Sequence, residues 1–123
     1  MLLVKTQLKN SRIHGVGIFA DEDIRKGTTI WRIYEGFDLE YSVEAVDKLP
    51  TAAREQVISR SYTSMDTGKL VMCGDDARFM NHSSHPNTKN GDKWTTIAVR
   101  DIARGEELTC DYYEFDTDAG RHF

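Results

Sequence analysis

The chain has 123 residues, of which 39% are hydrophobic and 29% are charged, with two prolines and no repetitive tract. This length fits a single domain, and the composition argues against a disordered, collagen-like or coiled-coil chain. The net charge of −4 argues against a protein dedicated to direct nucleic-acid binding.

Most of the expected elements are short strands. β-Branched and aromatic residues are enriched at 18–20, 28–34, 69–72 and 95–99, and glycines separate these segments. Between the second and third segments, Ser42 can cap a short helix that carries Val43, Val46 and Leu49 on one face. After Pro50 a second turn or two is expected through residues 52–57. The sequence therefore predicts a mainly β domain with one helical excursion.

Two segments resemble each other. Residues 23–30 (D-I-R-K-G-T-T-I) and 101–108 (D-I-A-R-G-E-E-L) each follow an apolar strand. Both predict a turn at a basic residue and a glycine, where the glycine supplies the positive φ of a tight reversal. Chance similarity is an equally good explanation for a match of eight residues.

The cysteines and the lack of a leader bear on the compartment. Cys73 and Cys110 are too few for a disulfide framework or a four-ligand zinc site. The apolar runs are far shorter than the ~20 residues that a spanning helix requires. The first residues have no basic region followed by an extended apolar stretch, as a signal peptide would. We expect an intracellular, soluble protein of the cytoplasm or nucleus that has no membrane partner.

The acidic residues are concentrated near the C-terminus. The window from 101 to 118 holds seven acids and one base. Such a surface could steer a basic peptide towards the protein, or it could be a solvated face that aids solubility. Composition alone favours the solvated face.

Residues 15–20 formally match the dinucleotide fingerprint G-x-G-x-x-A. That fingerprint requires an apolar strand before it and a helix after it. Here polar residues 9–12 precede the match and a charged segment, 21–27, follows it. Two glycines remain that allow the backbone to approach a ligand or a neighbouring strand closely.

Residues 78–87 (R-F-M-N-H-S-S-H-P-N) place polar side chains between an apolar pair and a proline. A turn-forming loop is the simplest interpretation. Residues 81–83 match a glycosylation sequon, which the lack of a secretion signal disfavours. His82 and His85 are too few ligands for a metal site, so no metal is expected.

Residues 105–113 (G-E-E-L-T-C-D-Y-Y) combine a turn with a strand that delivers two tyrosines. Taken with segments 11–17 and 78–87, in this order, they resemble the SET domain, the fold of protein-lysine methyltransferases that use S-adenosylmethionine. The matching family motifs are R-F-(I/M)-N-H-S-x-x-P-N and G-E-E-L-T-x-D-Y. The resemblance implies a β-clip fold with several short sheets, a small helical insert and a knot-like C-terminal crossing. The SET domain would cover residues 1–113, and 114–123 would form a short tail.

The resemblance also implies the site residues. Tyr112 would be the active-site tyrosine and Tyr62 a second one, although Tyr62 is assigned by spacing alone. The cofactor S-adenosylmethionine would contact a set drawn from several segments: His14, Gly15, Val16, Gly17, Tyr62, Arg78, Asn81, His82 and Phe115. The resemblance places the acidic window beside the active-site tyrosine and implies that Glu114, Asp116 and Asp118 line the approach of a cationic peptide.

The implied activity is methyl transfer to the ε-amine of a lysine in a basic protein or peptide, for which a histone tail is a candidate. A non-catalytic SET-like module that binds a peptide or partner is the alternative. Only eleven residues follow Tyr112, without the cysteine-rich zinc segment that completes the lysine channel in many relatives. Phe115, Phe123 and a second subunit in a homodimer are the candidates to close it. Cys110 stands where many relatives have Phe or Tyr.

Overall fold

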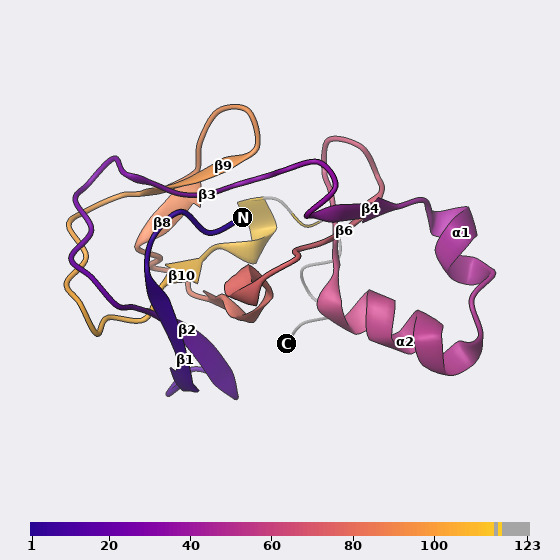
Figure 1. Ribbon diagram of the computed structural model, residues 1–123, viewed down its shortest axis with the longest axis horizontal. Coiled ribbons are helices and arrows are strands. Elements are labelled where there is room, and N and C mark those ends of the chain that lie inside the picture. The colour runs from indigo at the N-terminus through magenta and orange to yellow at the C-terminus, as the bar shows by residue number, and fades with distance from the viewer. Residues whose placement is uncertain (115, 117–123) are drawn as a thin grey trace.

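The computed structural model describes residues 1–114 and 116, and strands dominate it (Figure 1). Within these residues the strands form four small sheets, ordered β1–β2, β3–β9–β8, β4–β6–β5 and β7–β10. All the pairs are antiparallel except β7–β10, which is parallel. The bounds are β1 Thr6–Asn10, β2 Val16–Ala20, β3 Thr29–Arg32, β4 Leu39–Tyr41, β5 Tyr62–Thr63, β6 Leu70–Met72, β7 Asn81–His82, β8 Thr88–Asn90, β9 Thr95–Ala98 and β10 Thr109–Cys110.

The helical insert lies between β4 and β5, at one end of the molecule (Figure 1). It consists of α1 (Val43–Asp47) and α2 (Thr51–Arg60). The predicted cap is confirmed, since the Oγ of Ser42 accepts the N–H of Ala45 at 3.1 Å. The helix α2 follows Pro50, but it is longer than the turn or two expected and has no buried residue. No helix in the described part of the chain is long and apolar enough to cross a membrane.

The hydrophobic core draws on both halves of the chain. Four aliphatic residues that are at most 1% exposed come from segments far apart in the sequence, namely Ile18, Ile30, Ile102 and Leu108. Met80 and Cys110 pack into the same cluster, and Tyr112 packs partly buried against it. The core thus holds the start of β7 and the end of β10 in place from one side.

The two similar turns pair with each other. The backbones of Ile24 and Ile102 exchange both hydrogen bonds, at 2.8 and 2.7 Å. The φ angles of Gly27 and Gly105 are +86° and +95°, as a tight reversal requires. The likeness of the two segments therefore corresponds to equivalent places in the fold.

The parallel pair β7–β10 brings the end of the chain beside the segment 78–87. Thr109 lies opposite Asn81 and Cys110 opposite His82. The N–H of Ser83 donates to the carbonyl of Cys110 at 3.0 Å, which extends the pairing by one residue. This is the part of the expected C-terminal crossing that the described residues record.

Candidate active site

A cavity of about 500 Å³ lies between the helical insert, the β8–β9 loop and the segment after β10. Both predicted catalytic tyrosines, Tyr62 of β5 and Tyr112, line it. Two short 3₁₀ helices, η1 (Asp76–Phe79) and η2 (Tyr112–Glu114), contribute residues to its wall. Fifty residues separate the two tyrosines in the sequence, so the fold itself brings them to one cavity.

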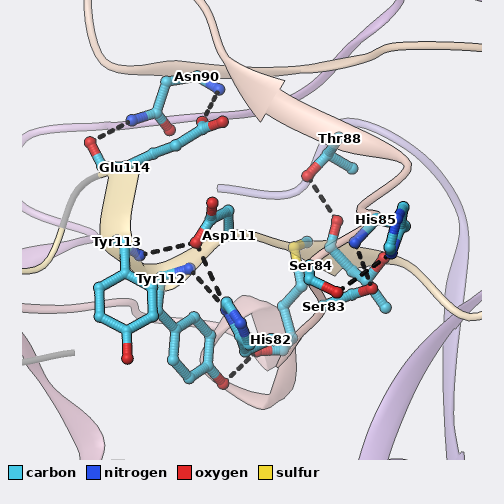
Figure 2. A network of polar contacts seen from close by, with 12 residues as sticks. His82, Ser83, Ser84, His85, Thr88, Asn90, Asp111, Tyr112, Tyr113 and Glu114 are labelled. Atoms are coloured by element: carbon cyan, nitrogen blue, oxygen red, sulfur yellow. Dashed lines mark hydrogen bonds and ion pairs between the residues drawn. The ribbon is translucent and has the colours of Figure 1, made fainter. Parts of the chain in front are cut away.

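Tyr112 is fixed at both ends by the segment that contains β7. Its hydroxyl donates to the carbonyl of Met80 at 2.7 Å, and its backbone N–H donates to Nδ1 of His82 at 3.1 Å (Figure 2). Parallel pairing of β7 with β10 places Tyr112 opposite these acceptors. The ring of Tyr112 is therefore held at the cavity wall in one orientation.

Burial keeps both tyrosine hydroxyls protonated. It raises the pKa of Tyr62 above its usual value, and the nearby Cys73 and Asp38 act in the same direction. Burial likewise raises the pKa of Tyr112, with smaller contributions from Cys110 and Asp116. A protonated hydroxyl orients a partner through a hydrogen bond and is a poor general base.

The two thiols at the cavity are also protonated. Burial raises the pKa of Cys73 to about 12, and burial also raises the pKa of the buried Cys110 above its usual value. A thiol without thiolate character is a weak nucleophile, so neither cysteine is suited to covalent catalysis here. They act as wall residues of modest volume.

Four carboxylates and three cationic side chains line the described part of the cavity, namely Asp66, Asp92, Glu114 and Asp116, and Arg60, Arg78 and Lys93. Asp116 is 2% exposed, and its Oδ1 accepts the N–H of Thr63 in β5 at 3.0 Å. Glu114 accepts the N–H of Asn90 at 3.0 Å and thereby ties η2 to β8 (Figure 2). Of the three acids expected to line the approach, Glu114 and Asp116 line the cavity, and Asp118 lies outside the described residues.

The predicted cofactor-binding residues fall into two groups. Tyr62 and Arg78 line the cavity. The loop 14–17 lies on the other side of β7, where Nδ2 of Asn81 donates to the carbonyl of His14 at 3.0 Å. His82 belongs to neither group, since Nδ1 of its imidazole accepts the backbone N–H of Tyr112 at 3.1 Å. Phe115, which was also predicted, lies outside the described residues.

The two glycines of this loop have different surroundings. Gly15 has a φ of +45°, and a Cβ built there would meet nothing within 4 Å. Gly17 is buried, and a Cβ there would overlap the carboxylate of Glu107. The loop thus presents exposed backbone and open space at Gly15, which fits the close approach of a small ligand such as the amino-acid moiety of S-adenosylmethionine. At Gly17 the missing side chain serves packing.

The sequence did not point to the tryptophans of the cavity. Trp31 and Trp94 both line it, and Nε1 of the buried Trp31 has no hydrogen-bond partner among residues 1–114 and 116. Trp94 and its neighbour Lys93 both have positive φ, at 59° and 54°, in the loop that joins β8 to β9. Two consecutive non-glycine residues in this conformation are uncommon, and no sequence signal announces them.

No three histidine, cysteine, aspartate or glutamate side chains in the described part of the chain are placed to hold a metal ion. The polar groups that do converge are two protonated tyrosines, the carbonyl of Met80, four carboxylates and three cationic side chains. The carboxylates exceed the cationic side chains by one. Such a set can bind and orient a cation and exclude water from it.

The SET domain family model matches residues 15–113 of this chain. The histone-lysine N-methyltransferase trithorax of Drosophila virilis is 34% identical over 121 residues, covering 83% of this chain and 3% of the relative. Histone-lysine N-methyltransferase ATX2 of Arabidopsis thaliana is 34% identical over 125 residues, covering 88% of this chain and 11% of the relative. This chain therefore spans only a small part of the length of these curated relatives.

The fold is shared with solved structures. The Polycomb Repressive Complex 2 of Chaetomium thermophilum, in an autoinhibited conformation bound to S-adenosylmethionine, contains a chain that matches with a TM-score of 0.67. That match has 24% identity and covers 96% of this chain and 16% of the other. The family model spans the β7–β10 pair as well as the loop at Gly15, so sequence and architecture agree. This chain belongs to the SET-domain family.

Proposed function

We propose that this protein is an S-adenosylmethionine-dependent protein-lysine N-methyltransferase whose substrate is a lysine in a basic protein or peptide. The observation that carries the proposal is the position of Tyr112. Its protonated hydroxyl is fixed on the carbonyl of Met80 at the wall of the cavity. The relatives named as histone-lysine N-methyltransferases support the reaction class and make a histone tail a candidate substrate.

The proposed chemistry is one displacement. The cofactor supplies a methyl group on a positively charged sulfur. With that cofactor bound, the lone pair of the neutral lysine amine would form a bond to the methyl carbon while the carbon–sulfur bond breaks and its electron pair goes to sulfur. A lysine that arrives as the ammonium would first lose one proton to solvent, because only the neutral amine has a lone pair.

The residues of this chain would act by placement. A tyrosine hydroxyl and backbone carbonyls near Met80 orient the amine, and the apolar wall excludes water. Burial in the cavity favours the neutral amine over the ammonium. The carboxylates of Glu114 and Asp116 attract the lysine side chain while it is still charged.

The two sides of β7 support separate binding of cofactor and peptide. Met80 lines the cavity, whereas the side chain of the next residue, Asn81, reaches the loop at His14. Consecutive residues of an extended segment point to opposite faces. We assign the amino-acid moiety of the cofactor to the His14 side and the lysine to the cavity, with Tyr112 between them. Tyr62 and Arg78, which were also predicted to bind the cofactor, lie on the cavity side.

We assign residues 1–113 to the SET domain and 114–123 to a tail that closes the site, alone or with a second copy of the chain. The buried contact of Asp116 with β5 supports a closing role for the tail. An intracellular, soluble enzyme is in keeping with this assignment.

The test is transfer of label from S-adenosylmethionine to a mixture of basic proteins. Tyr112→Phe removes the hydroxyl and keeps the ring, so transfer should fall by about 10²-fold, as is usual for losing a placed hydrogen-bond donor. Cofactor binding, measured by calorimetry, should change little. Tyr34→Phe, which removes a hydroxyl from an exposed tyrosine, is the matched control.

Two results would count against the proposal. If no protein, histones included, accepts label, the enzyme assignment is wrong. If the wild type in addition fails to bind S-adenosylmethionine, the alternative of a peptide- or partner-binding module is favoured.

A further inference from the structure

The side chain of His82 connects two elements that are far apart in the sequence, β7 and η2. His82 ends β7, and its imidazole faces the segment that follows β10 (Figure 2). Its Nδ1 lies 3.1 Å from the backbone nitrogen of Tyr112 and 3.5 Å from Oδ1 of Asp111. The rings of Tyr112 and Tyr113 pack against it with centroids 5.4 and 5.6 Å away.

The contact with Tyr112 fixes the protonation of the imidazole. A backbone N–H can only donate, so Nδ1 must offer a lone pair and the ring proton must be on Nε2. A proton on Nδ1 would face the N–H of Tyr112 directly. Such a proton could instead be donated to Oδ1 of Asp111, which already accepts the N–H of Tyr113 at 3.0 Å.

Two residues of the segment 80–82 therefore hold Tyr112 through two hydrogen bonds. The carbonyl of Met80 accepts its hydroxyl at 2.7 Å, and the imidazole of His82 accepts its backbone N–H. The first contact fixes the tip of the side chain and the second fixes the backbone from which it extends. Losing the second would remove one of the contacts that hold this backbone and would leave the hydrogen bond that the Tyr112 carbonyl accepts from the N–H of Asp116 at 2.9 Å.

We propose that neutral His82 is a positioning residue for Tyr112, whose hydroxyl it keeps aligned in the cavity by accepting the Tyr112 N–H on Nδ1. The proposal rests on the catalytic role assigned to Tyr112 above. It gives the imidazole a task that is separate from any contact between the main chain of residue 82 and the cofactor.

Protonation would release this contact. The titratable groups recorded against the imidazole are Asp111, which precedes η2, and the rings of Tyr112 and Tyr113 in η2. Asp111 is the carboxylate among them. The imidazolium would donate from Nδ1 to Asp111, and the N–H of Tyr112 would lose its acceptor. The alignment of Tyr112 should therefore weaken when the imidazole carries a second proton.

The first experiment uses nitrogen-15 NMR of the wild-type protein without cofactor or substrate. At pH 8 the side-chain nitrogens of His82 should report the Nε2–H tautomer. The amide signal of Tyr112 should shift together with the His82 signals on acidification. His85, an exposed histidine three residues away, is the control, and its titration should leave the Tyr112 amide signal unmoved. An Nδ1–H tautomer, or a Tyr112 amide signal that ignores the His82 titration, would overturn the proposal.

The second experiment compares two variants in the methylation assay. His82→Asn keeps an acceptor on the δ atom, whereas His82→Gln moves its acceptor one bond farther away. His82→Asn should be about tenfold more active than His82→Gln at pH 8, the effect of roughly one hydrogen bond. Equal activities of the two variants would contradict the proposal.

The pH dependence separates positioning from a general loss of fold. The substrate amine must lose a proton in every variant, so only the ratio of wild-type to His82→Asn activity reports on the imidazole. This ratio should fall on acidification, because the imidazole can take up a proton on Nδ1 whereas the asparagine amide cannot. A constant ratio would refute the switch. Absence of methylation by the wild type would refute the proposed function, while the NMR result would still decide whether His82 holds Tyr112.

Discussion

Gly15 and Gly17 occupy one loop but meet different physical constraints. At Gly15 the constraint is the backbone, since φ is +45° and the space around it is open. At Gly17 the constraint is the lack of room for a side chain, because a Cβ would lie 2.9 Å from Cδ of Glu107 and 3.0 Å from Cβ of Ser11. A formal match to G-x-G-x-x-A cannot distinguish these cases.

Alanine substitutions should separate the two constraints. Gly15→Ala should cost about 1 kcal/mol of unfolding free energy, the usual strain of a left-handed residue. Gly36→Ala should cost the same, since Gly36 has a φ of +83° and open space as well. Gly17→Ala should lower the unfolding free energy by about 1–3 kcal/mol, and it should weaken cofactor binding more than Gly36→Ala does. It displaces the Glu107 carboxylate, whose Oε1 lies 3.3 Å from Nδ2 of Asn81.

Urea denaturation measures these costs, and calorimetry with S-adenosylmethionine measures the binding. If Gly17→Ala proved no more harmful than Gly36→Ala in either measurement, the packing role of Gly17 would be wrong.

Most of the candidate site residues that the sequence offered came from motifs, and their roles stay predictions. Tyr112 and Asn81 lie in segments whose order and composition match the family, and the structure brings both to the β7–β10 pair. Tyr62 was placed by spacing, and it does line the cavity with Tyr112. Trp31 and Trp94 were missed because an aromatic residue in or beside a strand has the same local pattern whether it packs in a core or lines a cavity.

At the scale of elements, the side chain of Asn87 makes hydrogen bonds to backbone groups that a neighbouring β-strand would otherwise make. This side chain is 2% exposed, donates from Nδ2 to the carbonyl of Glu107 at 2.8 Å and accepts the N–H of Thr109 at 2.9 Å. An amide that pairs with a backbone N–H and a backbone carbonyl acts as one more rung between the start of β8 and β10. The sequence suggested only a turn residue here.

Asn87→Ala should therefore destabilise the fold strongly. It removes the partners of two backbone groups in the interior, and each unsatisfied group costs about 1–3 kcal/mol. We expect a loss of about 2–4 kcal/mol in unfolding free energy by urea denaturation. Asn10→Ala, at an exposed position of β1, should change the unfolding free energy by less than about 0.5 kcal/mol. Comparable losses for both variants would mean that Asn87 is not a structural rung.

The elements that the sequence predicted share a local signal. Strands β2, β3, β6 and β9 are rich in β-branched and aromatic residues, and α1 begins at a serine cap. The strand expected within 105–113 is confirmed as β10, but it ends at Cys110, and the two tyrosines lie in η2. The missed strands β4, β5, β7 and β8 are two or three residues long. Segments so short have no periodicity, and pairing with distant partners decides their conformation. The strand β1 was missed because its residues are mostly polar and exposed.

At the scale of the whole molecule, the paired turns act as a clasp between the two halves of the chain. Each turn offers a carboxylate to the other's backbone. Asp101 accepts the N–H of Lys26 at 2.8 Å, and Asp23 accepts the N–H of Arg104 at 2.9 Å. The same symmetry continues in the glycines, since Gly27 donates to Ala98 and Gly105 donates to Ala20, both at 2.8 Å.

This symmetry predicts matched effects of matched substitutions. Asp23→Ala and Asp101→Ala should each lower the unfolding free energy by about 1 kcal/mol, the typical value of one hydrogen bond. The two values should agree within about 0.5 kcal/mol, and urea denaturation at pH 7 measures both. Asp47→Ala, at the exposed end of α1, serves as the control. Clearly unequal losses at Asp23 and Asp101 would show that the two turns are alike in sequence and shape but not in energy.

The clasp also has a consequence for the order of events in folding. Ile24 and Ile102 can pair only after the chain between them has been brought round, and closing so long a loop is slow compared with forming a local hairpin such as β1–β2. Tyr112 reaches its acceptors on Met80 and His82 through β10, which follows the second turn directly. Methyl transfer, if this chain performs it, should therefore be among the last properties to return when the unfolded protein is diluted from denaturant.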